Sequence, residues 1–353
     1  AALAGQHAVL IGPPGTAKSL LARAFAGAIG GTRLFETLLT RFSTPEDLLG
    51  PLSLSALQAD RYKRVLTGRI ADCEVAFLDE VFKSNAGTLN AMLGILNERI
   101  VHDDGQAKKI PLVFAIGASN ELPKGEEGLD ALWDRFAMRI QVGYGKSRDT
   151  RRGLLLRTNG AHAGPVMTMA EWVAAMGEAA KTPLSDAVAA AFLTVIDKLA
   201  TKGIVVSDRR LVRLGALLRA AAYLNGDAAV ESDHFLGLAE ALWDKPEQRP
   251  DVASILAESA APEYSASLRK HDAVLPLVLD MLGKGTAADE VRAMTELDRA
   301  ITEIKTIAKT APEGSRTRER IKPLLVKLAD VYGDASKRSA ERHKRNPSAD
   351  IDF

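Results

Sequence analysis

Residues 12–19 read GPPGTAKS, and this octapeptide decides the fold. It follows a short apolar run at residues 8–11 and precedes a helix-forming stretch at residues 20–25. Strand, glycine-rich loop and helix in this order are typical of a phosphate-binding loop, where backbone N–H groups and the helix N-terminus attract phosphate oxygens. The residues predicted to bind nucleotide are Gly12, Pro13, Pro14, Gly15, Thr16, Ala17, Lys18, Ser19 and Leu20.

Two residues of this loop have specific chemical roles. The Lys18 ammonium would reach the β- and γ-phosphates, and the Ser19 hydroxyl would bind Mg²⁺. Ala17 stands where the strict motif has glycine. We expect a small side chain to be tolerated there if the local backbone is helical. The alternative on this motif alone is a Gly/Pro turn before an ordinary helix.

A second block, VAFLDE at residues 75–80, is an apolar run that ends in two adjacent carboxylates. Continuous hydrophobicity is typical of a central parallel strand that is buried on both faces. Successive side chains diverge at a strand end, so the two carboxylates can act separately. We expect Asp79 to hold Mg²⁺, directly or through water, and Glu80 to orient or deprotonate the attacking water. The two blocks together predict hydrolysis of ATP or GTP.

Composition and charge bound the class of protein. The chain has 353 residues, enough for two or three domains, and its 46% hydrophobic and 26% charged residues are ordinary for a soluble globular protein. A net charge of +1 gives no electrostatic case for nucleic acid or an anionic membrane. Cys73 is the one cysteine, which excludes an internal disulfide and suits the reducing cytoplasm, where we expect the protein.

Targeting signals are not expected in this sequence. No apolar run approaches the length of a membrane span, and the opening AALAGQHAVLI lacks the cationic start of a signal peptide. Because that opening runs directly into the phosphate loop, we expect the chain to begin inside a fold. Residues that would line the nucleotide base would then precede residue 1.

Short apolar strands alternate with helical stretches up to about residue 145, which predicts a parallel sheet with helices on both faces. The strands are expected near residues 7–11, 33–37, 74–79, 112–118 and 138–142. We predict an α/β nucleotide-binding core over residues 1–150, a helical lid domain over 151–250 and a C-terminal helical region with a basic tail over 251–353. Individual helices are expected over residues 185–200, 208–224 and 288–310.

The region after residue 245 is predicted in less detail. Pro246, Pro250 and Pro262 indicate a hinge. Within 288–310, apolar residues recur at spacings of three and four, so an amphipathic helix that packs mainly in a core is favoured over a partner surface. The basic tail at 337–345 has no interleaved aromatic residue, which favours a solvated or disordered end over a nucleic-acid arm.

Four further motifs follow in consistent order: TRFSTPEDLLGPLSLSAL at 40–57, ASNELP at 118–123, LWDRF at 132–136 and SDRR at 207–210. With GPPGTAKS and LDE, they closely resemble the MoxR branch of the AAA+ ATPases and, within it, the RavA-like group. The resemblance covers the chain up to about residue 250. It implies a P-loop core with a parallel sheet, followed by an all-helical lid. RavA carries a further β-containing insertion that is not found in this sequence.

The resemblance implies three more site residues. Asn120 looks like the polar sensor that contacts the γ-phosphate or the attacking water. Arg135 resembles the arginine finger that reaches the nucleotide of a neighbouring subunit, with Arg139 as the competing candidate. Arg209 resembles the second sensor, which reaches the nucleotide from the lid, with Arg210 as the alternate.

Each of these residues has a structural alternative. Asn120 could be a turn residue before Pro123, and Arg135 could form an ion pair with Asp134. Ser207 or Asp208 independently indicates an N-cap for the helix over 208–224, which is compatible with the lid interpretation.

Two insertions, residues 43–72 and 99–112, mark the branch. In MoxR proteins the first extends a β-hairpin from a helix, and Thr67-Gly68-Arg69 would be its return limb. The second indicates a hairpin with Asp104-Gly105 as its turn, which in the family projects toward a ring pore. Its polar residues Asp103, Asp104, Lys108 and Lys109 suit contact with a protein.

The resemblance implies Mg²⁺-dependent ATP hydrolysis in a homo-oligomeric, most often hexameric, ring. Its cofactors would be ATP and Mg²⁺, and the hydrolysis would drive chaperone-like remodelling or activation of a protein partner, usually one with a von Willebrand factor A domain. One alternative is a DNA-acting motor of the MCM and chelatase branch, against which the near-zero net charge argues. Another is a nucleotide-gated assembly factor, against which the intact Glu80 and Asn120 argue.

Overall fold

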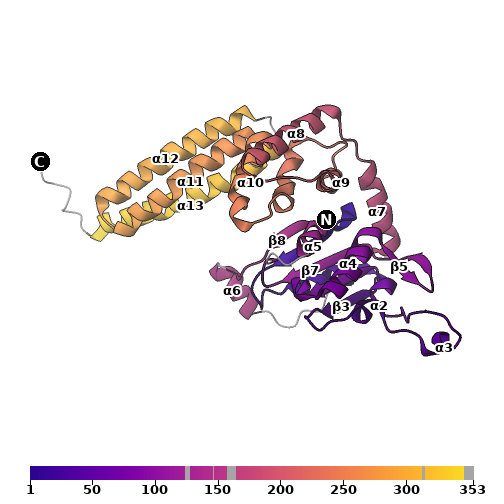
Figure 1. The fold of residues 1–353 in the computed structure, drawn as a ribbon. Helices are drawn as coiled ribbons and strands as arrows, with labels where there is room; N and C mark the ends of the chain where they lie inside the picture. The colour runs from indigo at the N-terminus through magenta and orange to yellow at the C-terminus, as the bar shows by residue number, and fades with distance from the viewer. Residues whose placement is uncertain (124–127, 146, 157–163, 312–314, 346–353) are drawn as a thin grey trace, which may run out of the picture. The chain divides into compact units, whose positions relative to one another are not determined.

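The computed structural model describes residues 1–123, 128–145, 147–156, 164–311 and 315–345. Over these residues the chain folds as two compact units (Figure 1). Unit 1 contains the sheet and comprises Ala1–Asp186, Ile204–Val230 and Glu240–Asp244. Unit 2 is helical and comprises Ala187–Gly203, Glu231–Ala239 and Lys245–Phe353.

A five-stranded parallel sheet forms the centre of unit 1. Its strand order is β3-β4-β7-β1-β8, so neighbouring strands are joined by crossovers and not by hairpins. The strands are β3 (Leu34–Leu38), β4 (Val75–Asp79), β7 (Phe114–Ser119), β1 (His7–Ile11) and β8 (Phe136–Gln141). Each strand begins and ends within about two residues of its predicted segment, and the predicted α/β core with a parallel sheet is confirmed.

The central strands are apolar along their length because the sheet is covered on both faces. Every residue of β1 and β7 is buried, and β4 is buried as far as Leu78. One core cluster joins Leu10, Phe77, Phe114 and Ile116 from the three strands. Helices that pack with the sheet in unit 1 are α1 (Lys18–Ala28), α4 (Ala86–Glu98) and α5 (Leu129–Arg135).

The order of the strands determines which loops meet. Strands β4, β7 and β1 are neighbours, with Leu78 paired to Gly117 and Ile11 paired to Ser119. The carboxyl ends of parallel neighbours lie at the same edge of a sheet. The phosphate loop after β1, Asn120 after β7 and the acidic end of β4 therefore lie together at one edge.

The remainder of unit 1 is mainly helical. Its helices α7 and α9 begin at capped ends, where the hydroxyls of Thr168 and Ser207 accept hydrogen bonds from backbone N–H groups three residues later. This confirms Ser207 as the N-cap. The elements of this part are η1 (Ala2–Ala4), β2 (Ile29–Gly30), α6 (Arg148–Leu155), β9 (Met167–Thr168), α7 (Met169–Lys181) and α9 (Asp208–Leu224).

Unit 2 contains helices from the second half of the chain, two of which, α8 and η4, also include residues of unit 1. The elements are α8 (Asp186–Thr201), η4 (Ser232–Ala241), η5 (Pro246–Gln248), α10 (Arg249–Ala260), α11 (Pro262–Lys284), α12 (Ala287–Thr310) and α13 (Arg316–Arg345). The long helices α11, α12 and α13 lie side by side in Figure 1 and bury a shared core that includes Leu297, Ile304 and Leu328. The predicted helical lid and helical C-terminal region are confirmed.

The structure adds detail to two predictions for this region. The expected hinge is helical, because Pro246, Pro250 and Pro262 each occupy the first or second position of a helix, where the missing N–H is not needed. The tail at 337–345, expected to be a solvated or disordered end, forms the last turns of α13. Its residues up to 340 are mostly exposed, in agreement with the expected solvation.

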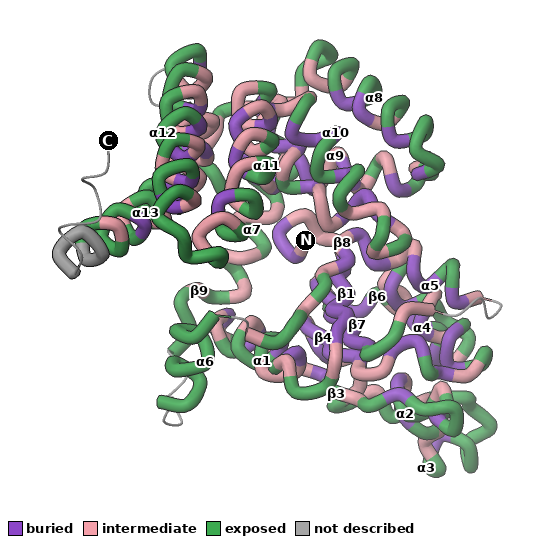
Figure 2. Tube along the Cα trace, turned by 90° about the vertical axis from the view of Figure 1, so that its left-hand side faces the viewer, coloured by how far each residue is buried: buried purple, intermediate pink, exposed green. Residues whose placement is uncertain are grey.

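The first insertion differs from the expected β-hairpin. Residues 43–72 form α2 (Pro45–Leu49), α3 (Leu54–Leu57) and η2 (Ile70–Asp72), and the stretch around α3 is mostly exposed (Figure 2). Its limbs meet at an isolated antiparallel bridge between Leu52 and Arg64. The return limb is therefore the segment at Arg64 and not Thr67-Gly68-Arg69, because Gly68 (φ 70°) turns the chain toward η2.

The second insertion is the predicted hairpin. Strands β5 (Ile100–Asp103) and β6 (Gln106–Lys109) pair in antiparallel fashion. Asp104 and Gly105 both have positive φ, of 55° and 72°, as a two-residue type I′ turn requires.

Among the helices of the described ranges, none is long and apolar enough to cross a membrane.

Candidate functional site

The phosphate loop is held in a specific backbone conformation. A Cβ atom at Gly12 would lie 1.9 Å from the carbonyl oxygen of Val142, so only glycine fits where these two backbones approach. The Thr16 hydroxyl closes the loop by donating to Pro13 O at 2.9 Å. From the segment after β8, the Tyr144 hydroxyl donates to Pro14 O at 3.0 Å. The loop is thus ordered by its own residues and by the neighbouring strand end.

Ala17 does not meet the condition under which we expected it to be tolerated, a helical backbone. It is the N-cap of α1 with φ 63° and ψ 28°, in the left-handed region. A non-glycine residue there costs about 1–2 kcal/mol, because Cβ approaches the following carbonyl oxygen. The chain therefore tolerates Ala17 at the price of local backbone strain.

Lys18, Asn120 and Glu80 form one hydrogen-bonded chain. The buried Lys18 ammonium donates to Asn120 Oδ1 at 2.9 Å and also to Gly12 O at 2.7 Å and Pro13 O at 3.1 Å. Asn120 Nδ2 donates to Glu80 Oε1 at 2.5 Å. The amide suits this position because it accepts from the cation and donates to the carboxylate without a charge of its own. Three of the predicted site residues are therefore in direct contact.

Glu80 has an unusual backbone. Its φ of 53° and ψ of 41° are left-handed, and the chain turns there from β4 into η3 (Val81–Lys83). Residues in such sparsely populated conformations are concentrated at functional sites. Its Oε2 lies 3.3 Å from Lys83 Nζ but is buried without a hydrogen bond. A water molecule, such as the one that attacks a phosphate, would supply the missing donor.

The predicted metal ligands lie on the loop and at the strand end. Asp79 Oδ1 accepts the Glu80 backbone N–H at 3.0 Å, and Ser19 lies in the first turn of α1. The described residues contain no cluster of three His, Cys, Asp or Glu side chains that could enclose a metal ion. This donor set fits Mg²⁺, which usually keeps several waters and takes one or two carboxylates together with phosphate oxygens.

Arg135 and Arg209 belong to a second group of side chains. Arg135 ends α5, and its Nε and Nη1 are buried without hydrogen-bond partners. Its ion pair with Asp134 is long, at 3.9 Å. Burial and the nearby charge of exposed Arg209 lower the pKa of Arg135, and Asp134 opposes them. The structure thus brings Arg135 and Arg209 near each other, and no described hydrogen bond or ion pair links either to the phosphate loop.

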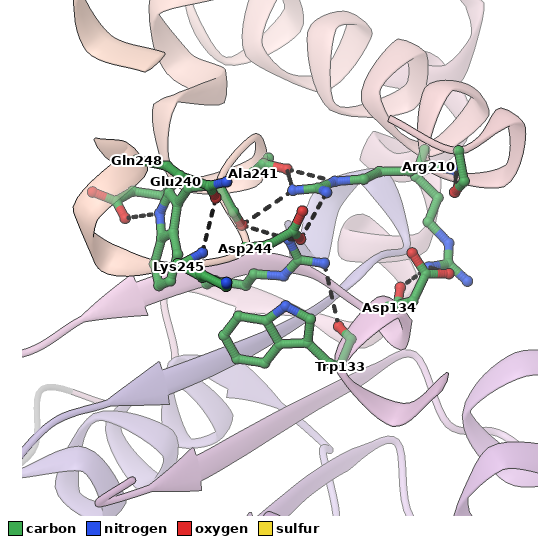
Figure 3. Close-up of polar contacts among 12 residues, drawn as sticks. Trp133, Asp134, Arg210, Glu240, Ala241, Asp244, Lys245 and Gln248 are labelled. Carbon is green, nitrogen blue, oxygen red and sulfur yellow. Dashed lines mark hydrogen bonds and ion pairs between the residues drawn. The ribbon is translucent and has the colours of Figure 1, made fainter. Parts of the chain in front are cut away.

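The competing candidates Arg139 and Arg210 are engaged elsewhere. Both are buried, and both form ion pairs with Asp244 Oδ1, at 2.7 and 2.9 Å. Arg210 also donates to Ala241 O, as Figure 3 shows, and Arg139 lies over the Trp133 ring at 4.7 Å from its centroid. These contacts give the two residues a structural role and favour Arg135 and Arg209 as the site arginines. Sequence reasoning had no signal for Asp244.

The two insertions contact each other. Asp103, one of the polar residues expected to suit contact with a protein partner, is buried within this chain. Its carboxylate accepts from the Arg64 backbone N–H and from Lys108 Nζ, both at 2.7 Å, which lowers its pKa against the effect of burial. The Asp104 N–H donates to Tyr62 O at 2.8 Å. The hairpin therefore supports the first insertion, and a cavity of about 430 Å³ lined by both contains Arg61, Arg64 and Lys108.

Comparison with known proteins agrees with this geometry. Residues 1–162 match the family described as the MoxR domain in the MoxR-vWA-beta-propeller ternary systems, and residues 188–256 match an AAA lid domain. A crystal structure from Cytophaga hutchinsonii has the same fold at 18% identity, with a TM-score of 0.58 over 72% of this chain and 85% of that one.

Two uncharacterized proteins of Methanocaldococcus jannaschii are 37% and 38% identical over 70% and 69% of this chain. The chain spans 65% and 63% of their lengths. Chaperone MoxR1 of Mycobacterium tuberculosis is 30% identical over 41% of this chain and 38% of its own length. The chain thus matches only part of the length of each of these relatives.

Proposed function

We propose that this chain hydrolyses ATP with Mg²⁺ at the edge of its parallel sheet, in keeping with the match of residues 1–162 to a MoxR domain. The observation that carries the proposal is the hydrogen-bonded chain from Lys18 through Asn120 to Glu80. It joins a phosphate-binding cation to a carboxylate that can act as a base, through a neutral amide between them. That is the minimum arrangement for attack of water on a terminal phosphate.

Each residue has a defined part in this proposal. Lys18 and the backbone N–H groups at the start of α1 bind the phosphates, and Asn120 holds the side chain of Glu80 in place. Glu80 accepts the proton of the attacking water. Ser19 and Asp79 would hold Mg²⁺, which would neutralise charge that develops on the phosphate oxygens.

We also propose that the chain acts as a homo-oligomeric ring, most often a hexamer in this family. The buried Nε and Nη1 of Arg135 have no hydrogen-bond acceptor, and an anionic phosphate from a neighbouring subunit would supply one. The charge of Arg209 acts on Arg135, and we propose that Arg209 adds positive charge for the same phosphate. Arg135 is thus proposed as the arginine finger and Arg209 as the second sensor.

A protein with a von Willebrand factor A domain is the proposed partner. The matched family description names vWA proteins as members of the same ternary systems. The joined insertions and the helices after residue 250 are surfaces that hydrolysis does not require. We propose that ATP binding changes the affinity of one of these surfaces for the partner, which is the coupling that remodelling needs. The RavA-like subgroup and the cytoplasmic location stay predictions.

Substitution of Glu80 tests the proposal. Glu80→Gln removes the base but keeps the shape, so turnover should fall by about a hundredfold or more while ATP stays bound. Glu98→Gln removes an exposed carboxylate of α4 and should leave turnover unchanged. Turnover is measured by phosphate release, and bound ATP by filtration. Wild-type turnover of Glu80→Gln would show that the role assigned to Glu80 is wrong.

The same variant tests the partner. Glu80→Gln loaded with ATP should bind a candidate vWA protein more tightly than the ADP-loaded wild-type chain does. Equal affinity with ATP, with ADP and without nucleotide would exclude remodelling and leave a passive complex.

A further inference from the structure

Two arginines, Arg135 and Arg213, share the carboxylate of Asp134 where the end of α5 meets the first turns of α9, and the charge of Arg209 acts on both arginines. Arg209 and Arg213 are four residues apart on α9 and so lie on the same face of that helix. Arg135 and Asp134 are the last two residues of α5. All four belong to unit 1. Two guanidinium groups that share one carboxylate leave an excess of positive charge, to which Arg209 adds.

Asp134 is shared between two of these arginines. Its Oδ2 lies 3.7 Å from Arg213 Nη1 and 3.9 Å from Arg135 Nη1. Arg213 makes a second interaction with Asp134, because its Nη1 also donates a hydrogen bond to the backbone carbonyl of Asp134. The Arg213 side chain is 13% exposed, so its two interactions with Asp134 are largely shielded from water. Asp134 and its carboxylate, labelled in Figure 3, are therefore held from the side of α9.

The interactions of Arg213 with Asp134 affect the hydrogen bonding of Arg135. Two of its guanidinium nitrogens are buried without a hydrogen bond, although a carboxylate on the adjacent residue is within reach. Buried unpaired donors are costly, and a charge-assisted hydrogen bond to that carboxylate would normally remove the cost. Attraction of the carboxylate toward Arg213 opposes this closure. Without Arg213, Arg135 would be the nearer cation for Asp134.

We propose that Arg213 is a positioning residue for the arginine finger, which holds Asp134 away from Arg135 so that the Arg135 donors stay available to a phosphate. The proposal rests on the proposed role of Arg135 in ATP hydrolysis. Arg213 touches neither nucleotide nor reacting atoms and acts through Asp134. Its place on the helix that also carries Arg209 joins both site arginines to α9.

A suppressor experiment in the full-length chain tests the proposal. Arg213→Gln should lower kcat for ATP about tenfold and change KM less than about twofold, because the finger acts mainly on the transition state. Adding Asp134→Asn removes the carboxylate that would then close on Arg135. The double variant should recover kcat to within about threefold of Asp134→Asn alone. A purely structural role of Arg213 would not be rescued in this way.

Arg219→Gln is the matched control, because Arg219 lies on the same helix and has no described hydrogen bond or ion pair. It should keep wild-type kcat. Thermal unfolding of every variant checks the fold. If Arg213→Gln does not fold, Arg213→Met, which removes the charge but keeps a long side chain, gives the same comparison with and without Asp134→Asn.

Failure of the suppressor would overturn the proposal, as would a wild-type kcat for Arg213→Gln. Arg135→Ala separates this inference from the proposed function. If Arg135→Ala loses activity but Asp134→Asn does not rescue Arg213→Gln, only the inference on Arg213 is wrong. If Arg135→Ala keeps wild-type kcat, both the role of Arg135 as the arginine finger and the role of Arg213 are wrong.

Discussion

The side-chain amide of Asn120 donates a hydrogen bond of 2.5 Å to Oε1 of Glu80. The opposite side of the same amide accepts from Lys18 at 2.9 Å. These contacts give Asn120 a more defined part than a turn residue before Pro123 would have. They hold the Glu80 carboxylate beside the phosphate loop and leave Oε2 as its oxygen without a hydrogen bond.

Asn120→Asp should lower kcat by about tenfold to a thousandfold. The aspartate still accepts from Lys18, but it cannot donate to Glu80 and places a like charge beside it. ATP affinity should change little, because Lys18 keeps its place on the loop. Steady-state kinetics and equilibrium binding of a fluorescent ATP analogue measure the two effects. Asn97→Asp on the exposed side of α4 is the control, and equal kcat for both variants would contradict the role of Asn120.

Arg135→Ala should lose most ATPase activity and keep its ATP affinity. The finger acts on transferring charge in a neighbouring subunit, an effect of about 10³–10⁵ in related enzymes. Mixing this variant with Lys18→Ala subunits should restore part of the activity, since some interfaces then combine an intact loop with an intact arginine. Activity is followed across mixing ratios, with mixed rings verified by mass. No recovery in verified mixed rings would argue against action between subunits.

Asp244→Ala should destabilise unit 1 by about 3 kcal/mol, because it leaves the guanidinium groups of Arg139 and Arg210 buried without their shared carboxylate. Asp251→Ala breaks the exposed pair with Lys202 and should cost less than about 1 kcal/mol. Urea unfolding measures both. Equal free energies of unfolding for the two variants would show that Asp244 does not hold these arginines in place.

Stability should decrease when the pH falls from about 6.5 to 4, in part because of His7. The ring is buried, donates from Nε2 to Leu96 O at 2.9 Å and accepts the Ala115 N–H on Nδ1 at 3.0 Å. Protonation of Nδ1 would break that second bond. Burial, with a smaller effect of Arg99, lowers the pKa of His7 to about 4, so the unfolded chain binds the extra proton first in this range.

The contribution of His7 is therefore complete above pH 6.5 and is lost at about 1.4 kcal/mol per pH unit below it. Urea unfolding at pH 7 and pH 5 measures the slope. His7→Gln keeps a donor for Leu96 O but does not titrate, and it should be less stable at pH 7 with a shallower decrease. An unchanged slope in His7→Gln would assign the pH dependence to other groups, and exposed His102→Gln serves as the control.

The sequence by itself determined the features that depend on neighbouring residues. Continuous apolar runs placed the central strands of the sheet, since a strand covered on both faces is mostly apolar. The spacing of GPPGTAKS placed the phosphate loop, and Asp104-Gly105 placed a hairpin turn, because glycine and aspartate adopt positive φ at low cost. The helices were likewise predicted from periodicity and caps.

Only the tertiary structure decided features that depend on residues far apart in the chain. Arg139 competes with Arg135 as the arginine finger in the sequence, and the contact with Asp244, 105 residues away, gives Arg139 a structural role. Asp103 is charged, yet it is buried because Arg64 and Lys108 satisfy it. The prolines expected at a hinge begin helices, and the role proposed for Arg213 depends on α9 meeting α5. Local patterns encode backbone conformation, whereas the pairing of charges is determined by which elements pack together.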